Sequence, residues 1–215
     1  MKGKDYILSL IEQGEHEHQD FKYQISDARK IARSISAFAN NTGGHLLIGV
    51  KDNGVVAGVK SDEEIYMIEQ AAQMYCQPEQ KVLFKLFKVE GKTVVKADIA
   101  EADVKPVKAP DDSGNWKAYY RVADENIVAS SLHVKMLKSD CDVDNAPSII
   151  NFTQREQTLI DYLSQHGGIT VTGVTRLLHC SRASAEQLAL SLHDMGILDI
   201  IYHNGAALLV GSDNA

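Results

Sequence analysis

The sequence has few of the residues that mark a disulfide framework, a disordered chain or a membrane protein. Its 215 residues include only three cysteines, four prolines and one tryptophan. Cys76, Cys141 and Cys180 are far apart and odd in number, so we expect reduced thiols rather than disulfides or a zinc site. No apolar run approaches the roughly 20 residues that cross a bilayer, and the first residues lead into an amphipathic segment rather than an apolar signal core. We therefore expect a globular, cytoplasmic protein with no membrane partner.

Positive charge is also scarce, which argues against a protein that coats DNA. The chain carries 22 Lys and Arg against 29 Asp and Glu, a formal net charge of −7, whereas non-specific DNA binding depends on neutralising phosphates. The scarcity is uneven, because residues 1–140 hold 19 of the basic residues and residues 141–215 hold three against eight acidic ones. A basic patch is therefore expected only in the first part of the chain.

Hydrophobic periodicity predicts an α+β domain with a mixed or mostly antiparallel sheet over residues 1–139. The expected helices cover residues 5–13, 26–41, 61–76 and 131–137. Ser61 and Glu64 form a capping-box pattern at the start of the third. The expected strands cover residues 15–23, 45–51, 55–59, 82–89, 93–99 and 116–122. Asp52-Asn53-Gly54 predicts a hairpin turn between the second and third strands.

The pattern changes after an acidic, polar stretch at residues 140–150, which we interpret as a linker. Residues 151–215 then predict three helices, at 153–166, 171–178 and 181–195, followed by a hairpin at 197–202 and 206–210. Helix, short helix, helix and two-stranded wing is the order of a winged helix-turn-helix domain.

The charge of this second domain disagrees with a role in reading DNA. Its third helix begins with Arg182 but carries Glu186 in the same turns, and the domain has no lysine. We expect it chiefly to mediate dimerisation or partner binding, with DNA contact secondary. The apolar residues on which this expectation rests are Leu188, Leu190, Leu192, Ile197, Leu198 and Ile200.

Several motifs, taken in order, resemble one known family. They are Glu15 followed by Asp20-Phe21-Lys22, then Ala37-Phe38-Ala39-Asn40-Asn41-Thr42-Gly43-Gly44, then Leu46-Leu47-Ile48-Gly49-Val50-Lys51-Asp52-Asn53-Gly54, and later Tyr119-Tyr120-Arg121-Val122. With them, residues 10–137 resemble the Schlafen/AlbA-like DNA-binding domain of bacterial proteins, formerly labelled a divergent AAA-type ATP-binding domain. The resemblance implies nucleic-acid binding, to DNA or structured RNA, and we interpret the chain as a transcriptional regulator that requires no cofactor.

The same resemblance raises an enzymatic alternative. In Schlafen proteins with ribonuclease activity, acidic residues matching Glu15, Asp20 and Asp52 form a metal-dependent site, which implies a divalent-metal-dependent endoribonuclease with Mg²⁺ or Mn²⁺ at these catalytic ligands. In a regular strand Glu15 and Asp20 would point to opposite faces, so their pairing requires a bend near residues 14–17. The alternative is that Asp20 and Asp52 are ordinary strand-edge and turn residues.

ATP is not expected as a cofactor, because the sequence has neither a Gly-x4-Gly-Lys-Ser/Thr loop nor a Gly-x-Gly-x-x-Gly loop. Asn40, Gly43 and Gly44 predict either a corner that defines the fold or a set of backbone amides that contact phosphate.

The candidate nucleic-acid contacts are basic side chains in and near these motifs. They are Lys22, Arg29, Lys30, Arg33, Arg121 and Arg182. A solvated helix face is the alternative for Arg29 and Arg33. The acidic balance also keeps open a third class of function, a protein-interaction or assembly module that binds no nucleic acid.

A homodimer is expected as well. Eukaryotic Schlafen cores pair two such lobes in one chain, so a chain with a single lobe is expected to pair with a copy of itself. Tyr66, Met67, Met74 and Tyr75 carry aromatic and sulfur groups that suit an interface, although packing on their own sheet is the alternative.

Overall fold

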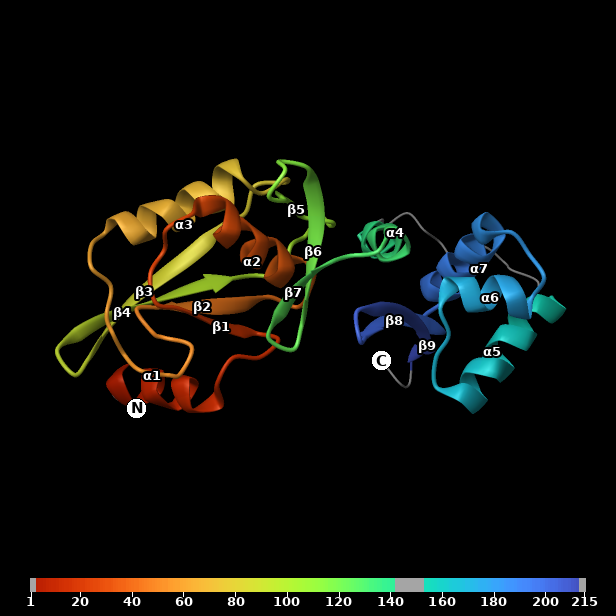
Figure 1. The fold of residues 1–215 in the computed structure, drawn as a ribbon, viewed down its shortest axis with the longest axis horizontal. Helices are drawn as coiled ribbons and strands as arrows, with labels where there is room; N and C mark the ends of the chain where they lie inside the picture. The colour runs from red at the N-terminus through yellow and green to blue at the C-terminus, as the bar shows by residue number, and fades with distance from the viewer. Residues whose placement is uncertain (1–2, 142–152, 213–215) are drawn as a thin grey trace. The chain divides into compact units, whose positions relative to one another are not determined.

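A computed structural model describes residues 3–141 and 153–212, and the chain divides into two compact units, residues 1–129 and 130–215 (Figure 1). The N-terminal unit is built from α1 (Gly3–Gln13), β1 (Gln19–Lys22), α2 (Ala28–Asn40), β2 (Gly44–Ile48), α3 (Glu63–Met74), β3 (Val82–Val89), β4 (Lys92–Ile99), β5 (Lys108–Pro110), β6 (Trp116–Val122) and β7 (Glu125–Val128). The C-terminal unit is built from α4 (Ser131–Ser139), α5 (Gln154–His166), α6 (Val171–Leu177), α7 (Arg182–Asp194), β8 (Leu198–His203) and β9 (Ala206–Gly211).

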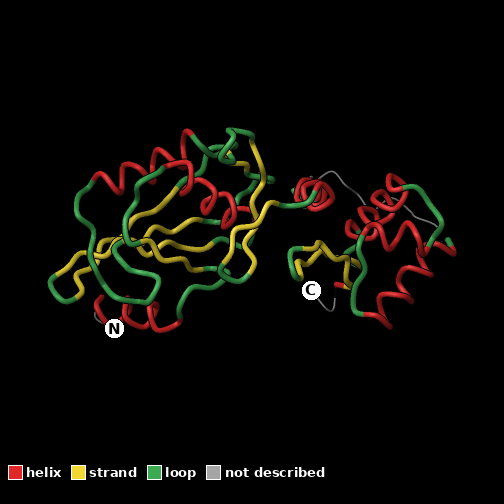
Figure 2. The backbone as a smooth tube through the Cα atoms, in the orientation of Figure 1, coloured by secondary structure: helices red, strands yellow, loops and turns green. Residues whose placement is uncertain are grey.

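A mixed four-stranded sheet organises the N-terminal unit, and this confirms the expected α+β class. Its strand order is β1-β2-β4-β3, with β1 parallel to β2 and the other pairs antiparallel. Helices α2 and α3 lie on one side of this sheet and α1 lies on the other (Figures 1 and 2). A second sheet, of order β5-β6-β7, packs beside α2. Because α2 crosses over between the parallel strands β1 and β2, both strands end at the same edge of the sheet.

Helix α2 is the central element of the larger core. The Asp27 side chain caps its first turn by accepting the Arg29 N–H, and Ile35 and Phe38 are completely buried between the helix and the sheet. The helix ends at a corner that needs glycine. Gly43 has a φ of +82°, and a Cβ atom on Gly44 would lie 2.3 Å from the Phe38 ring.

The prediction of a strand at residues 55–59 is wrong. Only an isolated bridge joins Val50 to Val56, and the chain then crosses close to the residue that follows β2, where the Gly58 N–H donates to the Gly49 carbonyl at 2.9 Å. A Cβ atom on Gly49 would lie 2.8 Å from the Gly58 backbone. Two glycines thus allow a backbone crossing in place of a regular hairpin.

The expected capping box at the start of α3 is also wrong. The helix begins after Asp62, whose side chain makes no capping hydrogen bond, and the Glu64 carboxylate accepts the Lys60 N–H at 3.1 Å. A Glu side chain therefore does satisfy a backbone donor here, but without the reciprocal bond from Ser61 that defines the motif.

The boundary between the units falls after Ala129 rather than after residue 139. Leu132 and Met136 of α4 are buried in the core of the C-terminal unit, and the Tyr202 hydroxyl accepts the Ser130 N–H at 2.8 Å. Helix α4 therefore belongs to the second unit. Residues 142–150 of the expected linker lie outside the described residues.

The helices and the hairpin expected after residue 150 are present in the C-terminal unit. Thr153 and Ser181 cap α5 and α7 with their side chains, and Gly167 ends α5 in the left-handed conformation. The apolar residues expected at an interface mainly serve this unit's own core. Leu192, Leu198 and Ile200 are buried there, and Leu188, Leu190 and Ile197 pack against it. Among the described residues, no helix has the length and hydropathy to cross a membrane.

Replacing Leu132 by Ala tests the assignment of α4. The side chain is buried in the C-terminal core, so the cavity should destabilise that unit by about 2–4 kcal/mol. Amide hydrogen exchange should show the loss of protection in α5 and α7 and not in the strands of the N-terminal unit. Lys138→Ala, an exposed change in the same helix, is the control. Equal protection in both variants would contradict the assignment.

Candidate functional site

A tight turn before β1 brings Glu15 back over the strand. The His16 N–H donates to the Gln19 carbonyl at 2.9 Å, and the Gln19 N–H donates to the His16 carbonyl at 3.1 Å. The Glu15 carboxylate then accepts the Phe21 N–H at 2.8 Å. This turn is the bend that a Glu15–Asp20 pair requires, and it brings the two carboxyl groups close enough for each to shift the pKa of the other.

Asp20 is a buried carboxylate held between two cations. Its side chain points into the unit with the residue only 3% exposed. Asp20 Oδ2 lies 2.7 Å from Lys22 Nζ, and Oδ1 lies 3.6 Å from a guanidinium nitrogen of Arg121. Burial opposes the ionisation of Asp20, but the hydrogen bond with Glu15 and the Lys22 ammonium outweigh it and hold its pKa below the ordinary value.

Glu15 responds in the opposite sense. Burial, together with its hydrogen bond to the Asp20 carboxylate, raises the pKa of Glu15 to about 7, although the Phe21 N–H works against this rise. The two carboxyl groups therefore act as a pair in which Asp20 is ionised and Glu15 keeps a proton below neutral pH.

The acidic trio is not assembled as a metal site. Asp20 lies opposite Leu46 in the middle of β2, whereas Asp52 lies in the exposed turn beyond the end of that strand. Within residues 3–141 and 153–212, no three His, Cys, Asp or Glu side chains are grouped so as to hold a metal ion. The charge of Asp20 is already neutralised by Lys22 and Arg121, so these donors do not fit a hard divalent cation.

Arg121 is not the phosphate contact that we expected. It is 1% exposed and is the largest fully buried side chain of the described residues. Its guanidinium donates to the carbonyls of His16 and Gln19 and to the Asn126 side chain, at 3.4, 3.2 and 3.1 Å, and lies over the Phe38 ring. Arg121 therefore binds the turn before β1 to β6 and is not accessible to a ligand.

Two other predicted basic contacts are held by carboxylates. Arg33 donates to the Pro110 carbonyl and pairs with Asp112 at 2.7 Å, which joins α2 to the β5–β6 connection. Arg182 pairs with Glu186 at 2.9 Å. A phosphate would have to displace a carboxylate to form a bidentate contact with either guanidinium.

Arg29 and Lys30 differ from these residues, because both are exposed at the start of α2. The Arg29 guanidinium lies 5.7 Å from the centre of the Tyr75 ring. Lys30 and Lys22 line a hollow of about 210 Å³ at the carboxyl end of β1, together with Gln24, Ser26 and other residues of that connection. In open α/β sheets, ligands bind beyond the carboxyl ends of parallel strands, and β1–β2 is the parallel pair of this mixed sheet.

The asparagines at the end of α2 have a structural role. Asn40 pairs with the backbone of Val107 through both its N–H (2.8 Å) and its carbonyl oxygen (2.7 Å). Asn41 pairs in the same way with the backbone of Arg121, at 3.0 Å for each bond. Of the two interpretations of the Asn40–Gly44 motif, this geometry favours the corner that defines the fold.

One cluster near the hollow was not predicted from the sequence. Tyr23, Lys51 and Lys60 meet beyond the ends of β1 and β2, with each lysine over the Tyr23 ring. The signal that would have found them is the parallel pairing of β1 and β2, because it places the residue after each strand at one edge of the sheet.

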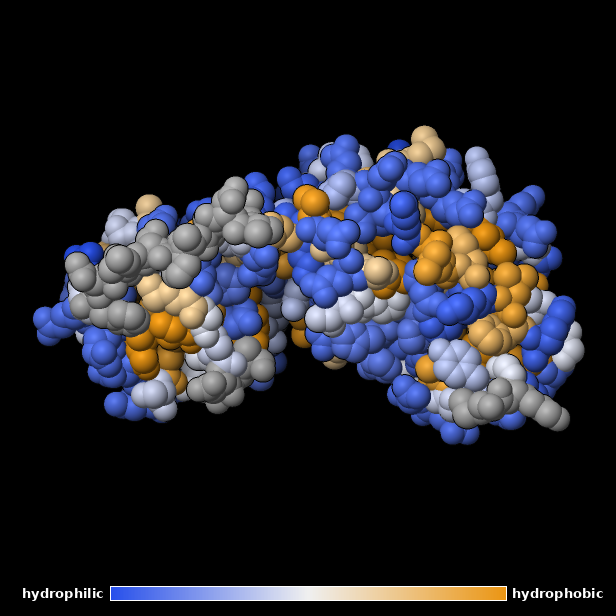
Figure 3. All heavy atoms as spheres, turned by 180° about the vertical axis from the view of Figure 1, so that it is seen from behind, coloured by the Kyte–Doolittle hydropathy of each residue, from blue (hydrophilic) through white to orange (hydrophobic). Residues whose placement is uncertain are grey.

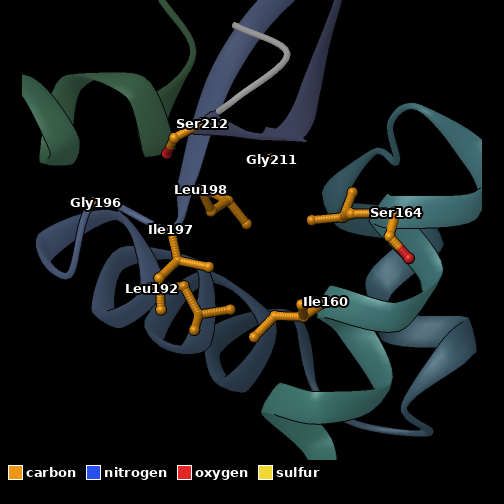
Figure 4. A pocket seen from close by; sticks show the side chains of 9 residues that line it. Ile160, Ser164, Leu192, Gly196, Ile197, Leu198, Gly211 and Ser212 are labelled. Atoms are coloured by element: carbon orange, nitrogen blue, oxygen red, sulfur yellow. The ribbon is translucent and has the colours of Figure 1, made fainter.

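The C-terminal unit contains a hollow of a different kind. Its volume is about 350 Å³, and Figure 4 shows Ile160 of α5, Leu192 of α7 and Leu198 of β8 on its walls. The lining is apolar apart from Ser164 and Ser212. Such a hollow suits an apolar group and not a phosphate.

Comparison with known proteins identifies the family of the chain. The model of the family described as Schlafen, AlbA_2 matches residues 15–130, which is more than half of the sequence. The chain therefore belongs to the Schlafen AlbA_2 family. None of the curated proteins matches the chain.

Two solved structures are similar to the chain. The DIP2311 protein from Corynebacterium diphtheriae is 18% identical with a TM-score of 0.43, and the match covers 92% of this chain but only 34% of DIP2311. The N-terminal domain of a RecG-related protein from Nitrosomonas europaea is 20% identical with a TM-score of 0.42, and the match covers 61% of this chain and 96% of that domain. The chain thus spans about a third of the length of DIP2311.

Replacing Glu15 by Gln should change how stability depends on pH. Because the folded pKa of Glu15 is raised from 4.5 to about 7, the folded state keeps a proton that the unfolded state has lost, and stability falls as pH rises across that interval. A Gln side chain can accept the Phe21 N–H and donate to Asp20 without titrating. Glu15→Gln should therefore be more stable than the wild type at pH 8, by about 1 kcal/mol after allowing for solvent screening.

Urea unfolding at pH 5 and pH 8 measures this effect, and the gain should shrink toward the acid end. Glu12→Gln removes an exposed carboxylate from α1 and is the control. An equal gain from both variants at pH 8 would show that net charge, and not the Glu15–Asp20 pair, is responsible.

Proposed function

We propose that the protein binds nucleic acid through its N-terminal unit and acts as a transcriptional regulator. The observation that carries the proposal is the exposed pair Arg29 and Lys30 at the start of α2, beside the hollow that Lys22 and Lys30 line. Neither Arg29 nor Lys30 forms an ion pair with another described residue. A chain with a net charge of −7 needs such a local cluster to approach phosphates. Membership of the Schlafen AlbA_2 family agrees with a function related to nucleic acid.

The C-terminal unit, which has the element order of a winged helix, is proposed to serve partner contact with DNA contact secondary. At the start of α7, where a winged helix would enter a major groove, Glu186 binds both Arg182 (2.9 Å) and Lys135 (2.8 Å). Two of the few cations in this unit are thereby neutralised by one carboxylate.

Binding is favoured over endoribonuclease activity by the state of the acidic residues. A divalent metal needs ionised carboxylates with free oxygen atoms. Asp20 is instead paired with Lys22 and Arg121, and Asp52 lies apart from it in an exposed turn. The proposed regulator accordingly binds its nucleic acid without Mg²⁺, Mn²⁺ or ATP.

The double replacement Arg29→Glu/Lys30→Glu tests the proposal. It should weaken binding to a labelled DNA duplex, and each lost phosphate contact should flatten the plot of log affinity against log salt by about 0.9. Fluorescence anisotropy over a range of salt concentrations measures both quantities in the full chain.

Lys81→Glu/Lys88→Glu is the matched control, because it makes the same change of charge at two exposed positions next to and on β3. An equal loss in both double variants would mean that charge alone matters and that α2 is not the contact. If the wild-type protein binds neither duplex nor single strands at low salt, the alternative of a protein-interaction module stands.

A homodimer formed through α3 is the second part of the proposal. Of the four residues expected at an interface, Tyr66 and Met74 are strongly exposed, whereas Met67 and Tyr75 pack partly against their own core. Figure 3 shows apolar side chains at the surface of the N-terminal unit among hydrophilic ones. Exposed apolar surface of this kind is typical of a contact with another protein.

Light scattering at tens of micromolar tests the dimer. The wild type should have the mass of two chains, and Tyr66→Lys/Met74→Lys should have the mass of one, because burying two charges at the interface is costly. A monomeric wild type would contradict this part of the proposal and leave the nucleic-acid contact intact.

A further inference from the structure

Tyr23 lies directly after β1 with an exposed ring and two lysines over it. The residue is 41% exposed. Lys51 Nζ lies 5.4 Å and Lys60 Nζ lies 5.6 Å from the centre of its ring. Lys51 follows β2 and Lys60 precedes α3, so three separate parts of the chain bring these groups together.

The ammonium groups of Lys51 and Lys60 lie near each other, and neither forms an ion pair with a carboxylate of the described residues. Since both distances end at the same ring centre, the two nitrogens are at most 11.0 Å apart. Lys60 also donates to the Gln24 side chain at 3.1 Å. Asp52 follows Lys51 in the sequence, yet no carboxylate of the described residues forms an ion pair with either lysine. An exposed cation–π contact stabilises by only about 0.5–1 kcal/mol, so both ammonium groups remain available to a phosphate.

The position of the cluster gives a second reason to expect a ligand. β1 and β2 are parallel and end at this edge of the sheet, and in open α/β sheets ligands bind beyond the carboxyl ends of parallel strands. The hollow lined by Lys22 and Lys30 also contains Gln24, the residue that holds Lys60. Tyr23 and the hollow are thus neighbours along a surface that carries Lys30, Lys51 and Lys60, beside Lys22, which pairs with Asp20, and Asp27, which caps α2.

We infer that Tyr23, Lys51 and Lys60 form a contact for single-stranded nucleic acid, in which an unpaired base takes the place of a lysine over the ring and the ammonium groups turn to its phosphates. This inference rests on the proposed nucleic-acid function and adds unpaired strands to the duplex that Arg29 and Lys30 are proposed to contact. In a duplex both faces of a base are covered by its neighbours, so an exposed tyrosine ring stacks only on a base that is already unstacked. Such stacking accepts any base, and the lysines supply the salt-dependent part of the affinity.

Anisotropy with the full chain tests the inference on three labelled probes, oligothymidylate and oligouridylate of about 15 nucleotides and a DNA duplex of the same length. Tyr23→Ala should weaken binding to the single strands about tenfold, and Tyr23→Phe, which keeps the ring, should stay within about twofold of the wild type. Binding to the duplex should not change. Trp116→Ala removes an aromatic side chain of similar exposure (38%) from β6 and is the control.

Lys51→Ala/Lys60→Ala tests the phosphate part separately. The slope of log affinity against log salt for the single strands should fall by about 0.7 for each lost contact. Lys81→Ala/Lys88→Ala should leave it unchanged. The same stacking contact would serve DNA and RNA. The relative affinities for oligothymidylate and oligouridylate therefore show which of the two the protein prefers.

Three results would count against the inference. If Tyr23→Ala binds single strands as tightly as Trp116→Ala, the Tyr23 ring does not stack on a base. If Tyr23→Ala loses as much affinity for the duplex as for the single strands, the contact is not specific for unpaired bases, and the proposed function survives. If the wild type binds none of the three probes, the proposed function itself fails. Retained wild-type binding by Tyr23→Phe shows that the fold at this position is intact.

Discussion

Two side-chain amides at the end of α2 join this helix to the second sheet of the N-terminal unit. Asn40 and Asn41 each pair with both backbone groups of one residue, Val107 and Arg121 respectively, as a neighbouring β-strand would. Both asparagines are buried, so the loss of either removes hydrogen bonds from buried backbone groups, the Val107 N–H among them, which is costly. The position of β6 depends on these bonds. Because β6 carries Arg121 to Asp20, the polar network around the carboxyl pair depends on them too.

Much of this fold was predictable because its elements carry strong local signals. The bounds predicted for β3, β4, β6 and α5 agree with the structure to within one residue, since alternation and capping residues determine them. The sequence could not show that the strand expected at residues 55–59 is absent. What replaces it is the close crossing of Gly49 and Gly58, a contact between two segments that local sequence patterns do not reveal. The sequence also predicted a helix over residues 131–137 but placed it in the first domain, because Leu132 and Met136 would suit either core.

The candidate site was less predictable, because the sequence does not reveal which charged side chains are paired with other groups of the same chain. The Glu15–Asp20 pair was recognisable only if the chain bends, and the turn between His16 and Gln19 provides that bend. Arg121 was chosen from a motif, but a motif does not distinguish a guanidinium that binds a ligand from one that binds its own chain. Tyr23 was overlooked because its partners, Lys51 and Lys60, are far away in sequence and are brought near by the pairing of β1 with β2.

The assignment of α4 to the second unit changes what a break in the chain would do. Residues 142–152 follow α4 and precede α5, so a protease that cuts there cuts within the C-terminal unit and not between the two units. The first fragment would keep Leu132 and Met136, and the second would keep Leu159 and the rest of the core that these side chains complete. The natural point for separating the two units as folded pieces is instead the Ala129–Ser130 bond.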